Sequence, residues 1–396
     1  MQFYRFPSHQ VLAICLLGIA LFGLSSCRGS STHCRSIERP VYRGEWGFID
    51  QTGAVVIKPQ FNSEAKFKDG LVNASFTADG KDFMTIVDRK GVPITSLRLK
   101  KTLEMLNDVA VVETLDKSDK PKEVDLPTQT YINRDGTIMP CRFRECGNFS
   151  NGVAVASLPI GPIDFPMGEK MFDEKGYIGN YVLIGRRGNI LKKLPGGAVR
   201  LNFSEGLIPL KVKTKTGYMD RKGEVAIPPK FWAAADFKEG LACVCMTNGG
   251  KWGFINHSGD LVLPCIFDGP SEFNEGLAKV DKGSESGFID ETGAFVLREK
   301  DWKCWGNFSD GLAAVHLNKP FSGGFIDKSG KVVIKLKPPI YLGDDFHEGL
   351  CKTNFYENNR GTFGYINRSG DWQIKPQFIE CSDFSEGLAA VCFHKQ

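Results

Sequence analysis

An all-β fold, in which about nine short units follow one another along the chain, is predicted by three features of this sequence. Two motifs recur at similar intervals, and a fixed step of six residues joins an aromatic residue of one unit to the next unit. The 44 glycines also accompany an ordinary 24% of charged residues. Frequent glycine with ordinary charge is typical of many tight turns between strands. We therefore expect stacked β-units rather than one large sheet.

The first motif is a phenylalanine, any residue, an acid or asparagine, and then glycine. Steps between its last six copies are 34, 36, 35, 38 and 38 residues. A period in the thirties indicates stacked supersecondary units. The copies begin at Phe67, Phe149, Phe203, Phe237, Phe273, Phe308, Phe346 and Phe384. We predict a structural role for the glycines that follow an acid in this motif: Gly70, Gly206, Gly240, Gly276, Gly311, Gly349 and Gly387.

The second motif is a short apolar strand that ends in Asp or Asn and reaches glycine three residues later. Asp at the first and Gly at the fourth position are typical of a type I turn, so a hairpin is predicted here. Its copies cover residues 46–53, 85–91, 131–136, 217–223, 252–259, 287–293, 324–330 and 364–370, with a variant at 182–188. Two copies begin with the pairs Trp46-Gly47 and Trp252-Gly253, which we also predict to be structural.

The strand after this hairpin carries proline and then an aromatic residue, as in residues 55–61 and 372–378. Proline lacks a backbone donor, so Pro59 and its equivalents are expected to end the strand. Six residues separate Phe61 from Phe67 and Phe378 from Phe384. A third short strand follows the motif glycine, for example at residues 387–391. Each unit is thus predicted to be a three-stranded meander.

The units are expected to stack as an open or gently superhelical array, with a closed propeller-like ring as the alternative. Propeller blades usually have four strands and rings four to eight blades. This chain offers three predicted strands per unit and about nine units, at steps that vary up to 54 residues. Repeats between residues 92 and 200 are eroded, and insertions at 117–127 and 157–180 interrupt the period. Insertions in repeat arrays map to loops on one face, often the binding face.

Together the three landmarks resemble the WG-repeat (KWG-repeat) family. The resemblance covers roughly residues 43–396, although the Trp-Gly pair itself survives at only two places. This family is an architecture rather than a chemistry. The resemblance therefore implies a binding or interaction role and no particular reaction.

The N-terminal segment predicts export. The apolar run at residues 11–24 is too short to span a bilayer and has the length of a signal-peptide core. Leu24-Ser25-Ser26-Cys27 resembles the bacterial lipobox, in which the cysteine becomes the lipid-modified first residue. We expect a signal peptide at 1–26, a lipidated tether at 27–42 and the array at 43–396. An ordinary cleavable signal is the alternative. The lipid would be the only membrane contact, at the outer membrane or cell surface.

Charge identifies no partner. The whole chain has a formal net charge of +4, and no basic run is interleaved with aromatic residues. A nucleic-acid partner is therefore not expected. We expect a monomer whose partner is a protein or a cell-wall or surface ligand of unknown identity.

Candidate chemical sites in the array are better explained by structure. Cys243 and Cys245 share a strand face, but no further ligands complete a zinc site. Ten cysteines remain besides Cys15 and Cys27, and most recur at core-like positions of the repeats. Burial as small apolar residues is favoured, and disulfides between neighbouring units are the alternative. The histidines are scattered, at His33, His257, His316, His347 and His394.

The motif acids form the most tempting column of ligands. Calcium needs six to eight oxygens, whereas each unit supplies one acid directly before a glycine, so a turn-forming role is favoured. The acids are Asp69, Glu205, Glu239, Glu275, Asp310, Glu348 and Glu386. We accordingly predict no metal, cofactor or catalytic residue in the array.

The function expected from the sequence is that of a non-enzymatic, envelope-anchored scaffold for protein interaction or ligand binding. A hydrolase acting on cell wall or glycan, or a carbohydrate-binding module, is the alternative. It would use the insertion at 157–180, where carboxylates are supplied by Asp164, Glu169, Asp173 and Glu174.

Overall fold

The array is entirely β-structured in the part of the chain that the computed structural model describes. The described residues are 45–78, 80–96, 99–102, 109–114, 129–158, 181–194, 197–198, 200–317, 323–341, 343, 345–357 and 360–394. Residues Arg43–Gln396 form one compact unit. Within the described residues there is no helix of the length and apolarity needed to cross a bilayer. The predicted signal peptide, Cys27 and the tether lie outside the described residues.

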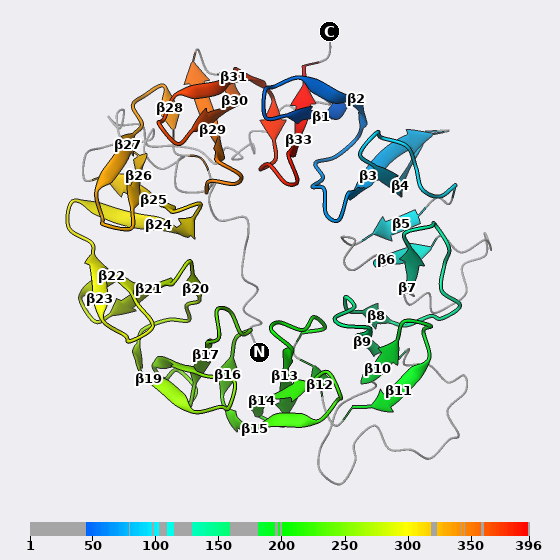
Figure 1. Ribbon diagram of the computed structural model, residues 1–396, viewed down its shortest axis with the longest axis vertical. Coiled ribbons are helices and arrows are strands. Elements are labelled where there is room, and N and C mark those ends of the chain that lie inside the picture. The colour runs from blue at the N-terminus through cyan, green and yellow to red at the C-terminus, as the bar shows by residue number, and fades with distance from the viewer. Residues whose placement is uncertain are drawn as a thin grey trace, which may run out of the picture. The chain divides into compact units, whose positions relative to one another are not determined.

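Small antiparallel sheets follow one another along the chain, and we call each repeat a blade (Figure 1). Blades 4 to 9 are each one four-stranded sheet in chain order. Blade 4 contains β8 (Glu145–Cys146), β9 (Val153–Ser157), β10 (Tyr181–Gly185) and β11 (Ile190–Lys193). Blade 5 contains β12 (Gly197–Ala198), β13 (Leu207–Val212), β14 (Lys215–Asp220) and β15 (Val225–Phe231). Blade 6 contains β16 (Ala233–Ala234), β17 (Ala242–Cys245), β18 (Trp252–Ile255) and β19 (Leu261–Phe267).

The three blades that follow have the same plan. Blade 7 contains β20 (Phe273–Asn274), β21 (Leu277–Lys282), β22 (Glu285–Ile289) and β23 (Phe295–Arg298). Blade 8 contains β24 (Trp302–Ser309), β25 (Leu312–Leu317), β26 (Gly323–Asp327) and β27 (Val332–Lys335). Blade 9 contains β28 (Ile340–Tyr341), β29 (Leu350–Glu357), β30 (Arg360–Asn367) and β31 (Trp372–Phe378).

The sheets thus have one strand more than the predicted meander. In blade 6 the additional strand is β16, which lies inside the six-residue step between Phe231 and Phe237. It pairs through only two residues, Ala233 with Cys245 and Ala234 with Val244. A strand of this length is too short to show an alternating pattern, which is why the sequence pointed to three strands.

Blades 2 and 3 share one five-stranded sheet. It contains β3 (Leu71–Ala78), β4 (Lys81–Asp88), β5 (Leu99–Thr102), β6 (Val109–Thr114) and β7 (Gln129–Asn133). The two repeats are joined where Met84 pairs with Leu99. In place of a full outer strand, blade 2 has a bridge from Val87 to Pro93, and blade 3 has two, from Ile132 to Ile138 and from Gln129 to Phe143. The erosion predicted in this region is therefore a loss of outer strands.

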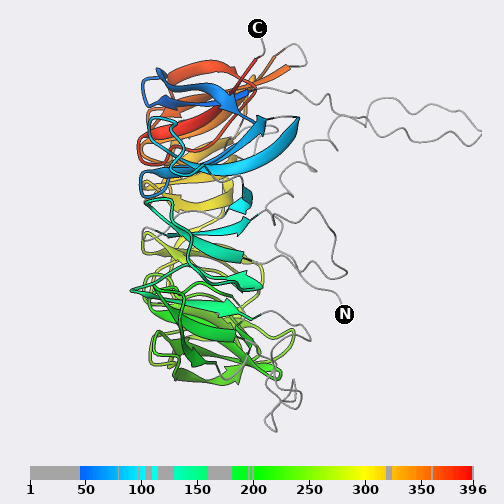
Figure 2. The ribbon, with the colours of Figure 1, turned by 90° about the vertical axis from the view of Figure 1, so that its right-hand side faces the viewer.

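The array closes on itself, because the two ends of the chain complete one sheet. Blade 1 combines β1 (Glu45–Asp50) and β2 (Val55–Phe61) with β32 (Glu380–Cys381) and β33 (Leu388–Phe393). Strand β1 pairs with β33 from Glu45 opposite Phe393 to Asp50 opposite Leu388. The all-β tandem array is confirmed, whereas the open arrangement is wrong. The alternative, a propeller-like ring, is what the structure shows (Figure 1). Seen from the side, the blades share one orientation (Figure 2).

Aromatic pairs fill the spaces between neighbouring blades. The Phe or Tyr of the third strand meets the motif Phe of the next blade at ring-centroid distances of 4.8–5.1 Å, tilted or edge-on. Such pairs contribute about 0.5–1.5 kcal/mol beyond their buried area. One unit alone would leave both faces exposed, so neighbours supply the core. The pairs are Phe48–Phe67, Tyr131–Phe149, Tyr218–Phe237, Phe254–Phe273, Phe288–Phe308, Phe325–Phe346 and Tyr365–Phe384.

The glycine of the Trp-Gly pair is required by the outer strand. A Cβ on Gly47 would lie 2.6 Å from the carbonyl oxygen of Ile57, and one on Gly253 would lie 2.5 Å from that of Leu263. The close approach accompanies register shifts in the pairing of β1 with β2 and of β18 with β19. Trp46 is buried beside this contact, and Trp252 is half-buried.

Proline lies within the outer strand rather than at its end, contrary to the prediction. Strand β2 continues past Pro59 to Phe61, and β19 continues past Pro264 to Phe267. These strands are sheet edges, where a missing backbone donor removes no ladder bond. The proline therefore marks an edge strand with a bulge.

Ring closure predicts a global effect of a terminal deletion. Removal of residues 379–396 takes away β32 and β33, and we expect loss of the single cooperative unfolding transition followed by circular dichroism. Removal of residues 395–396, which follow the last strand, is the control and should leave the transition unchanged. If the larger deletion left most of the β-structure melting at the original temperature, closure would not support the ring.

Candidate interaction surfaces at the two ends of the ring

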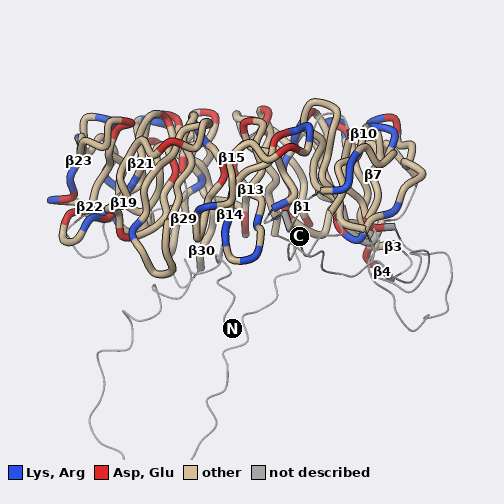
Figure 3. The backbone as a smooth tube through the Cα atoms, turned by 90° about the horizontal axis from the view of Figure 1, so that it is seen from below, with Lys and Arg blue, Asp and Glu red and all other residues tan. Residues whose placement is uncertain are grey.

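The two turns of each blade lie at one end of the ring, which we call the turn end. They join the first strand to the second and the third strand to the fourth. Because antiparallel strands reverse direction, the link between the second and third strands lies at the opposite end, the connection end. Acidic and basic segments alternate along the rim of the turn end (Figure 3).

The motif acid and glycine form a two-residue turn between the first and second strands. In blade 6 both residues have positive φ, 52° at Glu239 and 82° at Gly240. Lys238 and Leu241 exchange both backbone hydrogen bonds, at 2.9 and 3.1 Å. Two successive positive φ angles across a two-residue hairpin define a type I′ turn. The turn-forming role predicted for the acids is therefore confirmed.

In six blades the carboxylate of this turn also binds the equivalent turn of the next blade, and we call this contact the clasp. Glu239 accepts hydrogen bonds from the backbone nitrogens of Glu275 at 2.6 Å and Gly276 at 2.8 Å. Asp310 accepts from Gly349 at 2.7 Å. The clasp continues across the junction of the chain ends, where Glu386 accepts from Gly70 at 2.8 Å. The remaining clasps join Glu205 to Gly240, Glu275 to Gly311 and Glu348 to Gly387.

The backbone conformation shows why an acid is useful at this position. A residue with a Cβ in the left-handed region costs about 1–2 kcal/mol, whereas glycine adopts it readily. A hydrogen bond to a charged group contributes about 1.5–3 kcal/mol. The clasp can thus offset the conformational cost of the acid. The sequence indicated the turn but gave no sign of this second contact.

In several clasps a side chain from the other turn of the next blade adds a second contact. Arg368 Nη2 donates to the carbonyl oxygen of Asp310 at 2.6 Å, and Lys328 Nζ donates to that of Glu275 at 2.8 Å. At the chain junction Arg89 Nη2 donates to the carbonyl oxygen of Glu386. In these clasps the motif acid therefore contacts the next blade twice. Its carboxylate accepts a hydrogen bond from a backbone nitrogen, and its backbone carbonyl oxygen accepts one from a side chain.

His257 occupies this cation position in blade 6. Its Nε2 lies 3.2 Å from Glu205 Oε2, and its ring stacks on Phe237 at a centroid distance of 4.4 Å. His347 also contacts an acid, with Nε2 3.8 Å from Asp383 Oδ2. His316 packs edge-on against Trp305, and burial lowers the pKa of His316. His394 is exposed, and His33 lies outside the described residues.

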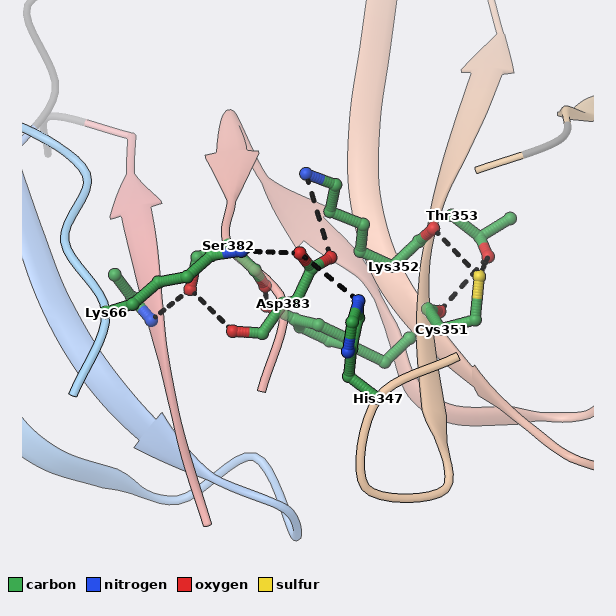
Figure 4. A network of polar contacts seen from close by, with 9 residues as sticks. Lys66, His347, Cys351, Lys352, Thr353, Ser382 and Asp383 are labelled. Atoms are coloured by element: carbon green, nitrogen blue, oxygen red, sulfur yellow. Dashed lines mark hydrogen bonds and ion pairs between the residues drawn. The ribbon is translucent and has the colours of Figure 1, made fainter. Parts of the chain in front are cut away.

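Asp383 is the centre of a polar network where the chain ends meet (Figure 4). Lys66 Nζ lies 2.6 Å from Asp383 Oδ2, and Lys352 Nζ lies 3.9 Å from Oδ1. Burial would raise the pKa of this carboxyl, but the hydrogen bond from Lys66 and the charges of Lys352, Lys66 and His347 outweigh it and hold the pKa low. The network joins blades 9, 1 and 2.

No group of three or more His, Cys, Asp or Glu side chains in the described residues has the arrangement of a metal site. The motif acids are spread around the rim, one to a blade, and six of them bind backbone nitrogens in clasps. The seventh, Asp69, has positive φ like the others and receives Arg134 Nη1 on its carbonyl oxygen at 2.8 Å. The column of acids is thus a structural device.

The nine described cysteines are free thiols. Seven are buried, including Cys243 and Cys245, which accords with the predicted role as small apolar residues. Burial raises the pKa of four of them to about 12: Cys146, Cys243, Cys304 and Cys381.

The connection end differs between two arcs of the ring. In blades 5 and 7 the link is short, from Val212 to Lys215 and from Lys282 to Glu285. In blades 3 and 4 it spans Thr114 to Gln129 and Ser157 to Tyr181, so both predicted insertions belong to this end. The eight-residue hairpins β3–β4 and β29–β30 and both ends of the array lie there too.

The residues of the alternative glycan site cannot be placed with these loops. Asp164, Glu169, Asp173 and Glu174 lie outside the described residues, as does the whole insertion at 117–127. The structural glycines of the motif, from Gly70 to Gly387, all lie at positive φ in turns, as predicted.

Comparison with protein families finds the WG containing repeat at six places in this chain. The matched residues are 46–75, 130–158, 217–251, 252–284, 324–337 and 363–395. The matches lie on both sides of the chain junction and leave out much of the eroded region. A search of curated proteins finds no match.

Solved structures resemble the chain only distantly. Prolyl oligopeptidase B from Galerina marginata matches with 10% identity and a TM-score of 0.39, over 85% of this chain and 51% of that one. Hsv2 of Kluyvelomyces marxianus matches with 8% identity and a TM-score of 0.35, over 66% of this chain and 88% of that one. The tricorn protease matches with 11% identity and a TM-score of 0.25, over 79% of this chain and 35% of that one.

Loss of one clasp is expected to weaken the ring. Glu275→Asn keeps a residue type that tolerates positive φ but removes the charged acceptor from Gly311, so unfolding free energy should fall by about 1.5–3 kcal/mol. The exposed pair of Glu285 with Arg298 supplies the control. Glu285→Gln should cost at most about 1 kcal/mol. Equal losses in the two variants, measured by denaturant unfolding, would contradict the clasp.

The thiols are expected to be protected and unpaired. Because burial raises the pKa of Cys146, Cys243, Cys304 and Cys381 to about 12, their reactive thiolates are scarce at pH 8. Ellman titration of the native protein should label these slowly, and denaturation without reductant should expose all nine described thiols. A thiol count that rises only after reduction would show disulfides instead.

Proposed function

We propose that this ring of WG repeats is a non-enzymatic scaffold, anchored in the bacterial envelope, that binds a partner protein at its connection end. The observation that carries the proposal is the gathering of long connections and extended hairpins on one arc. Loops held by a rigid scaffold are a common place for binding residues. At the turn end, in contrast, much of the polar chemistry is used in contacts between blades.

The arc is continuous around the chain junction. Going around the ring, it includes the link from Leu317 to Gly323 in blade 8, the hairpin β29–β30, both ends of the array, the hairpin β3–β4 and the two insertions. Blades 5 to 7 then complete the circle, with short links at 213–214 and 283–284 in blades 5 and 7 and a longer one at 246–251 in blade 6. A partner that contacts this arc would meet loops from several distant parts of the sequence. On such a surface the loop sequences would decide which partner binds, and the repeats would hold the loops in place.

Anchoring is proposed from the lipobox-like sequence that ends at Cys27. Strand β1 begins at Glu45, at the connection end, and the proposed tether precedes it in the sequence. Acyl chains on Cys27 would attach the ring to a membrane, since several chains together anchor more stably than one.

Site-specific photo-crosslinking in the native envelope tests whether a partner protein binds the ring and whether it binds at the connection end. A photo-crosslinking residue replaces exposed Lys81 at the connection end of blade 2 or exposed Thr292 at the turn end of blade 7. We expect a discrete protein adduct from position 81 and none from position 292. The adduct should persist when the turn at residues 213–214 is replaced and disappear when residues 159–180 are replaced by a short Gly-Ser link.

A Cys27→Ser arm tests the anchor. This variant should lose lipid labelling and leave the membrane fraction. Membrane association without labelled lipid would overturn the anchor, and adducts from position 292 alone would overturn the assignment of the connection end. Circular dichroism of each purified variant shows that the ring remains folded.

A further inference from the structure

The turn between the third and fourth strands follows one plan in seven blades. Its first residue is Asp or Asn, whose Oδ1 accepts two backbone hydrogen bonds from within the turn. In blade 5, Asp220 Oδ1 accepts from Lys222 N at 2.8 Å and Glu224 N at 2.9 Å. The same pair of bonds forms at Asp50, Asp88, Asn256, Asp290, Asp327 and Asn367.

Blade 4 keeps the turn but lacks its acceptor, because Gly185 stands at the first position. The backbone geometry is retained, since Gly188 N donates to Gly185 O at 2.8 Å and Gly185 N donates to Asn189 O at 2.9 Å. The nitrogens of Arg187 and Asn189 correspond to the two donors of the other turns. In the described part of the chain, no side chain accepts from either of them. Blade 4 therefore lacks the side-chain oxygen that Asp or Asn supplies in the seven other turns.

Two arginines flank this position, and neither has a counter-ion among the described residues. Arg186 and Arg187 are exposed, and neither makes a hydrogen bond or ion pair with any described residue. Asn151 takes the place of the motif acid in the same blade, so its turns carry no carboxylate. Blade 5 offers the contrasting case: Arg221 and Lys222 follow Asp220, whose carboxylate occupies its own turn.

The neighbouring strand β11 is suited to pair with an extended chain. It is the edge of its sheet, so one row of its backbone groups faces away from β10. No proline interrupts it, unlike β2, β15, β19 and β31. Ile190 and Leu191 are each 51% exposed. Residues 186–193 include four basic side chains and no acidic one.

We propose that this turn and β11 bind an acidic, extended segment of a partner protein. One carboxylate of the segment would take the oxygen position left by Gly185, between the Arg187 and Asn189 nitrogens and the two guanidinium groups. The segment's backbone would add to the free edge of β11, as peptides do in β-augmentation. Hydrogen bonds from arginine and backbone nitrogen to a carboxylate are charge-assisted and strong. This site lies outside the connection end and does not depend on the function proposed there.

The test uses the full ring and a fluorescein-labelled peptide of four Glu-Val repeats, followed by anisotropy at low salt. Gly185→Asp restores the usual turn and should weaken binding at least tenfold, as should Arg186→Glu with Arg187→Glu. Gly185 is not among the glycines with positive φ, so Asp is compatible with its backbone, and Asn189 Oδ1, 3.0 Å from a Cβ built there, can rotate away. Lys222→Glu is the matched control in blade 5 and should change affinity less than twofold.

Nuclear magnetic resonance gives a second measurement, in which the amide signals of Arg187 and Asn189 should shift on addition of the peptide. Unchanged affinity in Gly185→Asp, with melting at or above that of the parent, would overturn the carboxylate site. A peptide of four Glu-Pro repeats cannot add as a strand, so equal binding of it would overturn pairing with β11. Tighter binding of oligogalacturonate than of the Glu-Val peptide would overturn the assignment to a protein partner.

Discussion

The ring depends on the hydrogen bond between the carboxylate of one turn and the backbone nitrogen of the next. A blade of four short strands cannot bury both of its faces, so its stability comes from its neighbours. The aromatic pairs supply attraction between blades but leave their relative position adjustable. The clasp fixes that position at the rim, because a carboxylate in a turn of defined conformation reaches the donor of the following turn. Its repetition from Glu205 to Gly70 carries the same geometry through the chain junction.

Other features are consistent with this constraint. The Trp-Gly glycine admits the outer strand close to the third strand, and proline is tolerated there because the strand is an edge. In blades 2 and 3, where Thr85 and Thr130 replace that glycine, the outer strand is reduced to isolated bridges. Blade 4 keeps its outer strand β11 although Val182 stands at the same position, so the glycine alone does not decide how the outer segment pairs.

Much of this fold could be predicted from local sequence, and the remainder could not for identifiable reasons. Turn chemistry located Asp50–Gly53 and the acid–glycine turns, since each depends on four neighbouring residues. The short strand β16 escaped notice because two residues carry no periodicity. Closure escaped because pairing of Glu45 with Phe393 joins opposite ends of the array and has no local signature. The variant turn at 182–188 was visible in the sequence, but its missing acceptor became meaningful only beside the intact turns. The clasp likewise required coordinates, because its donor and acceptor lie in different repeats.

Blade 1 combines strands from both ends of the chain, so it can be completed only after the last strand is available. Strand β1 precedes nearly all other described strands, yet its partner β33 is among the last residues of the chain. During synthesis or export, the edge formed by residues 45–50 has to wait for the whole of the remaining array. Contacts of such large sequence separation are slow to form. Until the final residues arrive, intermediate blades can assemble from local hairpins, while the chain still presents an unpaired strand to its surroundings. A factor that shielded this edge would act in that interval, before the circle is complete.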